Sequence, residues 1–167
     1  LQGFASPAVV TVWAVFIISA GLQRSGVAEI MARQLLRLAG DSETRLLLFL
    51  MVGSGLMSAF MNNIGAVAIL MPAVISIGRK LEISPSKLLM PLAFAALLGG
   101  NMTLIGTPPN ILAADIMAAY GVEPFGFFDF LPTGVLVLVV GIVYMMLIGR
   151  KLLPERIPAS GFEGYRV

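Results

Sequence analysis

Three long runs of the sequence carry no charged residue, and these runs decide what the chain can fold into. They cover residues 46–78, 88–114 and 130–149, and each is bounded by Lys, Arg or Asp side chains. A helix that crosses a bilayer needs roughly 20 mostly apolar residues. Only 12% of all residues are charged, whereas soluble domains carry about 25%. The sequence therefore predicts an all-α membrane protein built of transmembrane helices.

The residue types that are absent exclude several kinds of chemistry. The 167 residues include no cysteine and no histidine, so disulfides, thiolate nucleophiles and imidazole acid–base catalysis are excluded. The sequence offers no nucleophile–base pair, metal cluster or carboxylate pair, and we do not expect an enzyme. The pI is about 9.3, but no Lys/Arg cluster interleaves with aromatic residues, so no nucleic-acid partner is expected.

The first charge-free run is interrupted near its middle, at Asn62-Asn63. The limbs on either side are about 14 to 16 residues long, or roughly 22 Å as helix, against a hydrocarbon core of ~30 Å. Residues 46–78 are therefore predicted to form a re-entrant helical hairpin with its tip at membrane depth. Irregular backbone is tolerated there only inside protein or beside an aqueous cavity. Two complete spans would give the same sidedness, so charge alone leaves that alternative open.

The second run predicts a broken transmembrane helix over residues 83–120. Gly99-Gly100-Asn101 and then Gly106-Thr107-Pro108-Pro109-Asn110 interrupt it. Two consecutive prolines cannot continue a helix, and each pushes the preceding residue toward extended backbone. The break is therefore expected in mid-membrane, with a short helix after it.

The remaining segments follow from the same charge map. Residues 23–45 include Glu29, Arg33 and Arg37 at four-residue spacing, which predicts a cytoplasmic amphipathic helix lying at the membrane interface. The alternative is a soluble helix packed on a cytosolic domain. We also expect a first transmembrane helix (1–22), a last transmembrane helix (129–150) and a cytoplasmic tail (151–167).

The distribution of basic residues orients these segments. All eleven Lys and Arg residues fall on one side if residues 23–45, 79–87 and 150–167 share it and residues 1–6 and 115–129 lie opposite. The positive-inside rule makes the first side cytoplasmic. The chain is therefore predicted to be integral to the cell inner (plasma) membrane, with the hairpin entering from the cytoplasm.

The hairpin tip is the first candidate site. An unpaired amide in hydrocarbon costs several kcal/mol, so Asn62 and Asn63 need partners. Their carbonyl oxygens are suitable ligands for Na⁺, and their N–H groups can donate to an anion. The N-terminus of the following limb adds a positive dipole end. Ser58 lies four residues before Asn62 and is expected to face the same tip. The alternatives are amides that join helices and a serine that bonds to its own helix.

The proline break is the second candidate site. A helix broken at the bilayer midplane exposes carbonyl and hydroxyl groups without any charged side chain, as secondary transporters do at their ion and solute sites. The alternative is a proline kink absorbed by packing. The polar and backbone groups concerned belong to Thr103, Gly106, Thr107, Pro108 and Asn110.

Two stretches of sequence resemble the divalent anion/Na⁺ symporter family, within the ion-transporter superfamily that includes citrate and arsenite carriers. They are Ser58-Ala59-Phe60-Met61-Asn62-Asn63-Ile64 and Gly99-Gly100-Asn101-Met102-Thr103-Leu104-Ile105-Gly106-Thr107-Pro108-Pro109-Asn110. The resemblance covers nearly the whole chain and implies one half of an inverted-repeat transporter. It also implies a missing second repeat of the same chain, elevator-type movement and a homodimer when full length.

In that family, a tip carrying Ser-Asn-Thr and the following broken helix hold one Na⁺ and one end of a dicarboxylate or sulfate. The resemblance places Asn63 at the motif's Asn, with Ser58 and Gly106 among the Na⁺ ligands. Asn62 stands in place of the motif's Ser and keeps an oxygen ligand. Ile64 stands in place of its Thr and lacks the hydroxyl.

These expectations combine into one functional hypothesis, Na⁺-coupled symport of a small divalent anion such as a dicarboxylate or sulfate. The alternatives are an arsenite- or citrate-type carrier, an H⁺-coupled carrier, or a membrane module that does not transport. The expected partners are the coupling ion Na⁺, a small anionic solute and membrane lipid. The predicted Na⁺ ligands are Ser58, Asn62, Asn63, Thr103 and Gly106. The predicted solute-binding residues are Asn62, Asn63, Thr107, Pro108 and Asn110.

Overall fold

The computed structural model describes residues 7–26, 30, 34, 37 and 42–153. Within these residues all regular structure is helical, as the sequence predicts. The order is α1 (Pro7–Arg24), α3 (Glu43–Phe60), α4 (Asn63–Lys80), α5 (Pro85–Gly99), the 3₁₀ turn η2 (Gly100–Met102), α6 (Pro108–Ala119), α7 (Leu131–Tyr144), the π-helical segment η3 (Met145–Gly149) and α8 (Arg150–Leu152).

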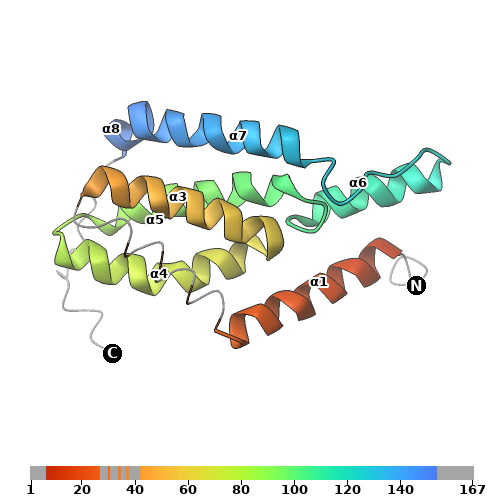
Figure 1. Ribbon diagram of the computed structural model, residues 1–167, viewed down its shortest axis with the longest axis horizontal. Helices are drawn as coiled ribbons and strands as arrows, with labels where there is room; N and C mark the ends of the chain where they lie inside the picture. The colour runs from red at the N-terminus through yellow and green to blue at the C-terminus, as the bar shows by residue number, and fades with distance from the viewer. Residues whose placement is uncertain (1–6, 27–29, 31–33, 35–36, 38–41, 154–167) are drawn as a thin grey trace.

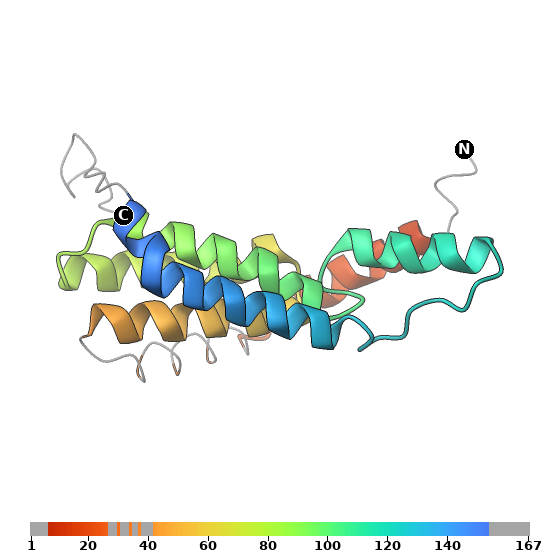
Figure 2. The ribbon, with the colours of Figure 1, turned by 90° about the horizontal axis from the view of Figure 1, so that it is seen from above.

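The helices form two groups along the long axis of the molecule. Helices α3, α4, α5 and α7 lie roughly parallel in one bundle, whereas α1 and α6 lie side by side beyond its end (Figures 1 and 2). The tip between α3 and α4 lies where the groups meet, beside the break between α5 and α6. The tip is therefore located near the middle of the long axis, and α6 continues past it.

Prolines and charged residues define where these helices start and stop. Pro85, Pro108 and Pro132 occupy first-turn positions, where a missing N–H has no consequence and φ is already helical. Helix α3 starts with Glu43, and α4 ends with Arg79 and Lys80. Both placements suit the helix dipole.

The two hairpin limbs are longer than the sequence suggested. Helices α3 and α4 have 18 residues each, or about 27 Å, because their charged ends are helical as well. Among the described residues, three helical segments are long and apolar enough to cross a membrane, namely Glu43–Phe60, Asn63–Lys80 and Leu131–Leu152. Limb length therefore does not by itself require a re-entrant hairpin. The re-entrant hairpin therefore remains a prediction.

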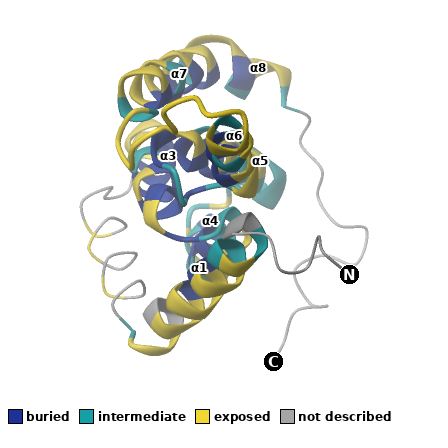
Figure 3. Ribbon diagram, turned by 90° about the vertical axis from the view of Figure 1, so that its right-hand side faces the viewer, coloured by how far each residue is buried: buried dark blue, intermediate teal, exposed yellow. Residues whose placement is uncertain are grey.

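The core is centred on α3, more than half of which is buried between its neighbours (Figure 3). One apolar cluster joins α3 to α4 and α5, and a second joins α3 to α5 and α7. Helices α3 and α5 touch at Gly55 and Gly99, where a Cβ on Gly99 would overlap the backbone of Gly55. A third, smaller cluster centred on Val15 and Ile111 joins α1 to α6.

A buried serine adds a polar tie between α3 and α5. Ser54 is fully buried, and its hydroxyl donates to the Leu92 carbonyl at 2.9 Å. We expect Ser54→Ala to lower the free energy of unfolding by about 0.5–1.5 kcal/mol. Thermal melting of the protein in detergent would measure this loss. Ser76→Ala, on an exposed position of α4, is the control and should leave the melting temperature unchanged; equal melting of both variants would contradict the prediction.

Two predicted segments lie largely outside the described residues. Of the amphipathic helix predicted over residues 23–45, the part from 27 to 41 is described only at Ile30, Gln34 and Arg37, which are helical and exposed. The predicted tail over residues 151–167 is described only to residue 153.

Candidate functional site

The hairpin tip consists of two residues with non-helical backbone. Met61 is extended, with φ −141° and ψ 162°, and this ends α3. Asn62 then caps α4, since its Oδ1 accepts the N–H of Ile64 at 3.2 Å. This is the usual way in which an asparagine starts a helix. The side-chain oxygen of Asn62 therefore has a structural partner within the tip.

Ser58 and Asn63 bring oxygen atoms from the two limbs together. The Ser58 hydroxyl donates to Asn63 Oδ1 at 2.5 Å. Ser58 is fully buried on α3, and Asn63 is half-buried at the first position of α4. The Asn63 amide lies directly against Gly100, where a side chain would collide with it. Two of the predicted Na⁺ ligands thus meet in one place, beside the start of the break.

Thr103 joins the break to the hairpin. This fully buried residue donates its hydroxyl hydrogen to the carbonyl of Ala59, in the last turn of α3. Its oxygen accepts the N–H of Gly106 at 3.2 Å, and its own carbonyl accepts Nδ2 of Asn110 at 3.0 Å. Carbonyls in the last turn of a helix lack helical partners, so Thr103 satisfies one of them. One lone pair of the hydroxyl remains after these two bonds.

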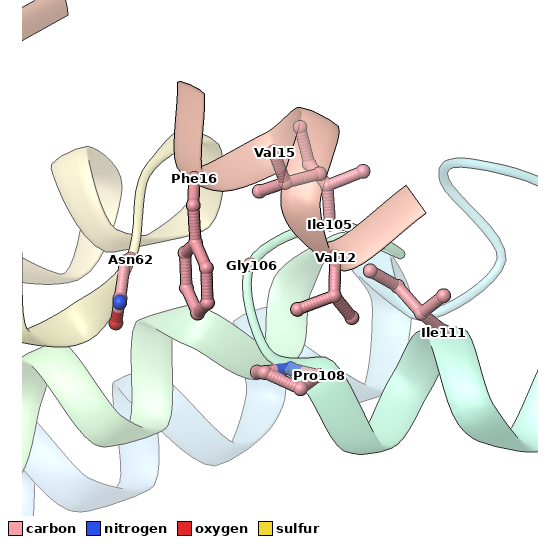
Figure 4. A pocket seen from close by; sticks show the side chains of 8 residues that line it. All are labelled: Val12, Val15, Phe16, Asn62, Ile105, Gly106, Pro108 and Ile111. Atoms are coloured by element: carbon pink, nitrogen blue, oxygen red, sulfur yellow. The ribbon is translucent and has the colours of Figure 1, made fainter. Parts of the chain in front are cut away.

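A small cavity lies between the tip, the break and α1 (Figure 4). Asn62 comes from the tip, while Gly106 and Pro108 come from the break. Val12, Val15 and Phe16 of α1, with Ile105 and Ile111, complete the lining. Its volume is about 10 Å³, enough for roughly one water molecule. The structure therefore brings the two candidate sites to one place and covers them with α1.

Thr107 and Pro108 lie at the edge of this arrangement. Thr107 is half-buried at the N-cap of α6, and its side chain makes no capping hydrogen bond. Pro108 is exposed in the first turn of α6 and reaches the small cavity. Asn101 is different: it is exposed, and its amide donates to the Leu97 carbonyl at 3.2 Å. Asn101 therefore satisfies a carbonyl in the last turn of α5.

Two residues at this place were not predicted. Gly100 lies against the Asn63 amide. Ser19 on α1 is buried, and its hydroxyl oxygen accepts the backbone N–H of Asn62 at 3.1 Å. Its signal in the sequence is weak, since Ser19 is a single hydroxyl in the apolar stretch from Val12 to Leu22. Nothing in the sequence pairs it with a residue 43 positions away.

The groups that meet at the tip and the break are neutral oxygen atoms and helix ends. In the described part of the chain there is no group of three or more His, Cys, Asp or Glu side chains that could hold a metal ion. Neutral hydroxyl, amide and carbonyl oxygens at helix breaks are the groups that coordinate Na⁺ in transporters. The C-terminal end of α3 and the N-terminal end of α4 meet at the same tip, so a negative and a positive dipole end lie close together.

Apolar helices that surround a polar tip and a polar helix break are typical of membrane transport proteins. The comparisons with known proteins identify the family: the chain belongs to the citrate transporter family, CitMHS, whose profile matches residues 1–160. This agrees with the resemblance to the superfamily of citrate carriers, and the family consists of transporters rather than enzymes. No solved structure matches the chain.

Several curated proteins are similar to the chain. It is 44% identical to the uncharacterized transporter YfbS of Escherichia coli (strain K12), over 93% of the chain and 26% of that protein. It is 42% identical to the uncharacterized transporter sll0640 of Synechocystis, over the same shares. Sodium/sulfate cotransporter 1 of Chlamydomonas reinhardtii is 37% identical over 59% of the chain and 12% of that protein. The chain thus spans about a quarter of the length of the first two relatives.

Proposed function

We propose that the chain forms half of the binding site of a secondary active carrier, which couples Na⁺ entry to the uptake of a small divalent anion. The observation that carries this proposal is the meeting of Ser58 and Asn63 at 2.5 Å, at a helix tip in contact with a helix break. Ser58, Asn63 and the backbone around Gly106 are proposed to hold the ion. The N-terminal turns of α4 and α6 are proposed to face the anion.

The hairpin is proposed to be re-entrant and to open from the cytoplasm. Three features support this topology. The outer ends of α3 and α4 and the short helix α8 lie at one end of the bundle, and they include the basic residues Arg45, Arg79 and Arg150. The tip lies midway along the long axis, beside the break. Helices α1 and α6 extend beyond the tip on the other side, which leaves the tip at depth.

Sulfate is the first solute to test. Three similar proteins of Chlamydomonas reinhardtii bear names that join sodium to sulfate. The family description favours citrate as a second candidate. Dicarboxylates are a weaker choice, because Ile64 lacks the hydroxyl that the Thr of the family motif offers at this position. Coupling to H⁺ is the alternative to coupling to Na⁺.

Asn63→Ala is expected to lower Na⁺-driven sulfate uptake by more than about tenfold. The substitution removes Oδ1 of Asn63, which accepts the Ser58 hydroxyl and is a proposed ligand of the ion. The measurement is radiolabelled sulfate uptake into vesicles carrying the complete gene product, with an inward Na⁺ gradient. Citrate and succinate are tested as competitors. Asn101→Ala is the control, since it removes an exposed amide at the helix break next to the tip. Its uptake should stay near that of the unaltered protein.

Three results would overturn parts of this proposal. Uptake that is unaffected by Asn63→Ala would remove the tip from the binding site. Uptake by the unaltered protein that follows a pH gradient and ignores Na⁺ would replace the coupling ion. Na⁺-driven uptake of labelled citrate, with no uptake of sulfate, would favour the citrate-type alternative.

A further inference from the structure

Asn62 has a backbone donor that neither helix of the hairpin can satisfy. Extended backbone at Met61 ends the hydrogen-bonding pattern of α3, and α4 begins only at Asn63. The N–H of Asn62 therefore needs a partner from elsewhere, because an unpaired donor away from water is costly. In the structure this partner is Ser19 Oγ on α1, 3.1 Å away.

Ser19 lies with Val15 on the buried face of α1. Only 3% of Ser19 is exposed, while the neighbouring Ile17 and Ile18 are 69% and 57% exposed. Phe16 of the same helix lines the small cavity together with Asn62 and Gly106 (Figure 4). Helix α1 thus presents one hydroxyl to the tip and apolar side chains to the space between tip and break.

We propose that Ser19 is a positioning residue for the ion and solute site, and that α1 forms the third wall of that site. By accepting the Asn62 N–H, the hydroxyl fixes the residue that precedes Asn63 and caps α4. Without this hydrogen bond, Asn62 is held less firmly, and the Asn63 amide is no longer fixed in its orientation toward Ser58. This inference rests on the proposed function for its effect on ion binding, but its effect on the tip itself does not.

A cysteine reporter at the tip can measure the effect of Ser19 on the tip separately from its effect on ion binding. The 167 residues contain no cysteine, and Ile64 is 76% exposed one position after Asn63. Ile64→Cys is introduced into the complete gene product, with any other cysteine replaced. The rate of its reaction with a maleimide is measured in detergent, first without Na⁺ (choline chloride) and then with increasing NaCl.

Adding Ser19→Ala is expected to raise the Na⁺-free labelling rate by about fivefold or more, because the tip loses one hydrogen bond that restrains it. The NaCl concentration for half-maximal protection should rise by a similar factor of about five. Ser19→Thr keeps the hydroxyl and should stay within about twofold of the parent reporter in both measurements. Ser76→Ala, on the exposed side of α4, should match the parent.

The outcomes distinguish this inference from the proposed function. If Ser19→Ala labels at the parent rate with the parent Na⁺ dependence, the inference is wrong. A lower melting temperature of Ser19→Ala with unchanged labelling would reduce Ser19 to a packing residue, which also overturns it. If NaCl protects none of the proteins, Na⁺ coupling fails, while the Na⁺-free labelling rates still decide whether Ser19 positions the tip.

Discussion

Gly99→Ala is expected to destabilise the protein by roughly 3 kcal/mol or more, the upper range for overpacking a close helix contact. A Cβ at Gly99 would overlap backbone atoms of Gly55, and backbone cannot rotate away as a flexible side chain does. The helices α3 and α5 would have to separate where both apolar clusters depend on their contact. The measurement is the melting temperature and the yield of monodisperse protein in detergent.

Two other glycines provide graded controls for this prediction. A Cβ at Gly55 would meet the side chain of Leu138 at 2.8 Å, and a leucine side chain can move, so Gly55→Ala should cost clearly less. A Cβ at Gly21 has nothing within 4 Å, so Gly21→Ala should melt like the unaltered protein. If all three variants melted alike, the backbone contact between α3 and α5 would not be important for stability.

Thr103→Val is expected to lower both the stability of the protein and its affinity for Na⁺. Valine has the shape of threonine but leaves the Ala59 carbonyl and the Gly106 N–H without their hydroxyl partner. Each unpaired buried group costs about 1–3 kcal/mol. Thermal melting measures the loss of stability, and the Na⁺ dependence of sulfate uptake measures the loss of affinity, which should exceed tenfold, or about 1.4 kcal/mol.

The control variants separate two roles of Thr103. Thr103→Ser retains the hydroxyl and should recover most of both properties, whereas Thr133→Val, at an exposed position of α7, should change neither. A weaker Na⁺ dependence without any change in melting would mean that Thr103 only contributes a ligand. Unchanged Na⁺ dependence despite lower melting would remove Thr103 from the ion site.

The placement of the helices follows from local features of the sequence. The charge-free runs indicate where apolar helices lie, and prolines at positions 85, 108 and 132 mark their first turns. Asn62-Asn63 marks the turn between α3 and α4. The limb lengths were underestimated because charged residues at helix ends were counted as boundaries. They belong to the helices, since terminal charges of the right sign are favourable there.

The hydrogen bonds of the site depend instead on long-range packing. Thr103 reaches a carbonyl 44 positions away, and Asn62 reaches a hydroxyl 43 positions away. Composition and periodicity describe one segment at a time, so they do not say which hydroxyl meets which backbone group. They predict that the amides of Asn62 and Asn63 need partners. Only the structure identifies Ser19 as the acceptor for the Asn62 backbone N–H and Ala59 as the acceptor for the Thr103 hydroxyl.

The contact between Gly55 and Gly99 also limits how such a protein can move. Because the backbones touch there and Thr103 ties α3 to the break near Ala59, the hairpin and the broken helix act mechanically as one block. The block meets α1 through apolar side chains and through the hydrogen bond from the Asn62 N–H to Ser19. A shift along this surface would therefore break one hydrogen bond. We therefore expect access to the Ser58–Asn63 pair to change by a shift of the whole block against α1, since the tip cannot part from the break without breaking its closest contacts.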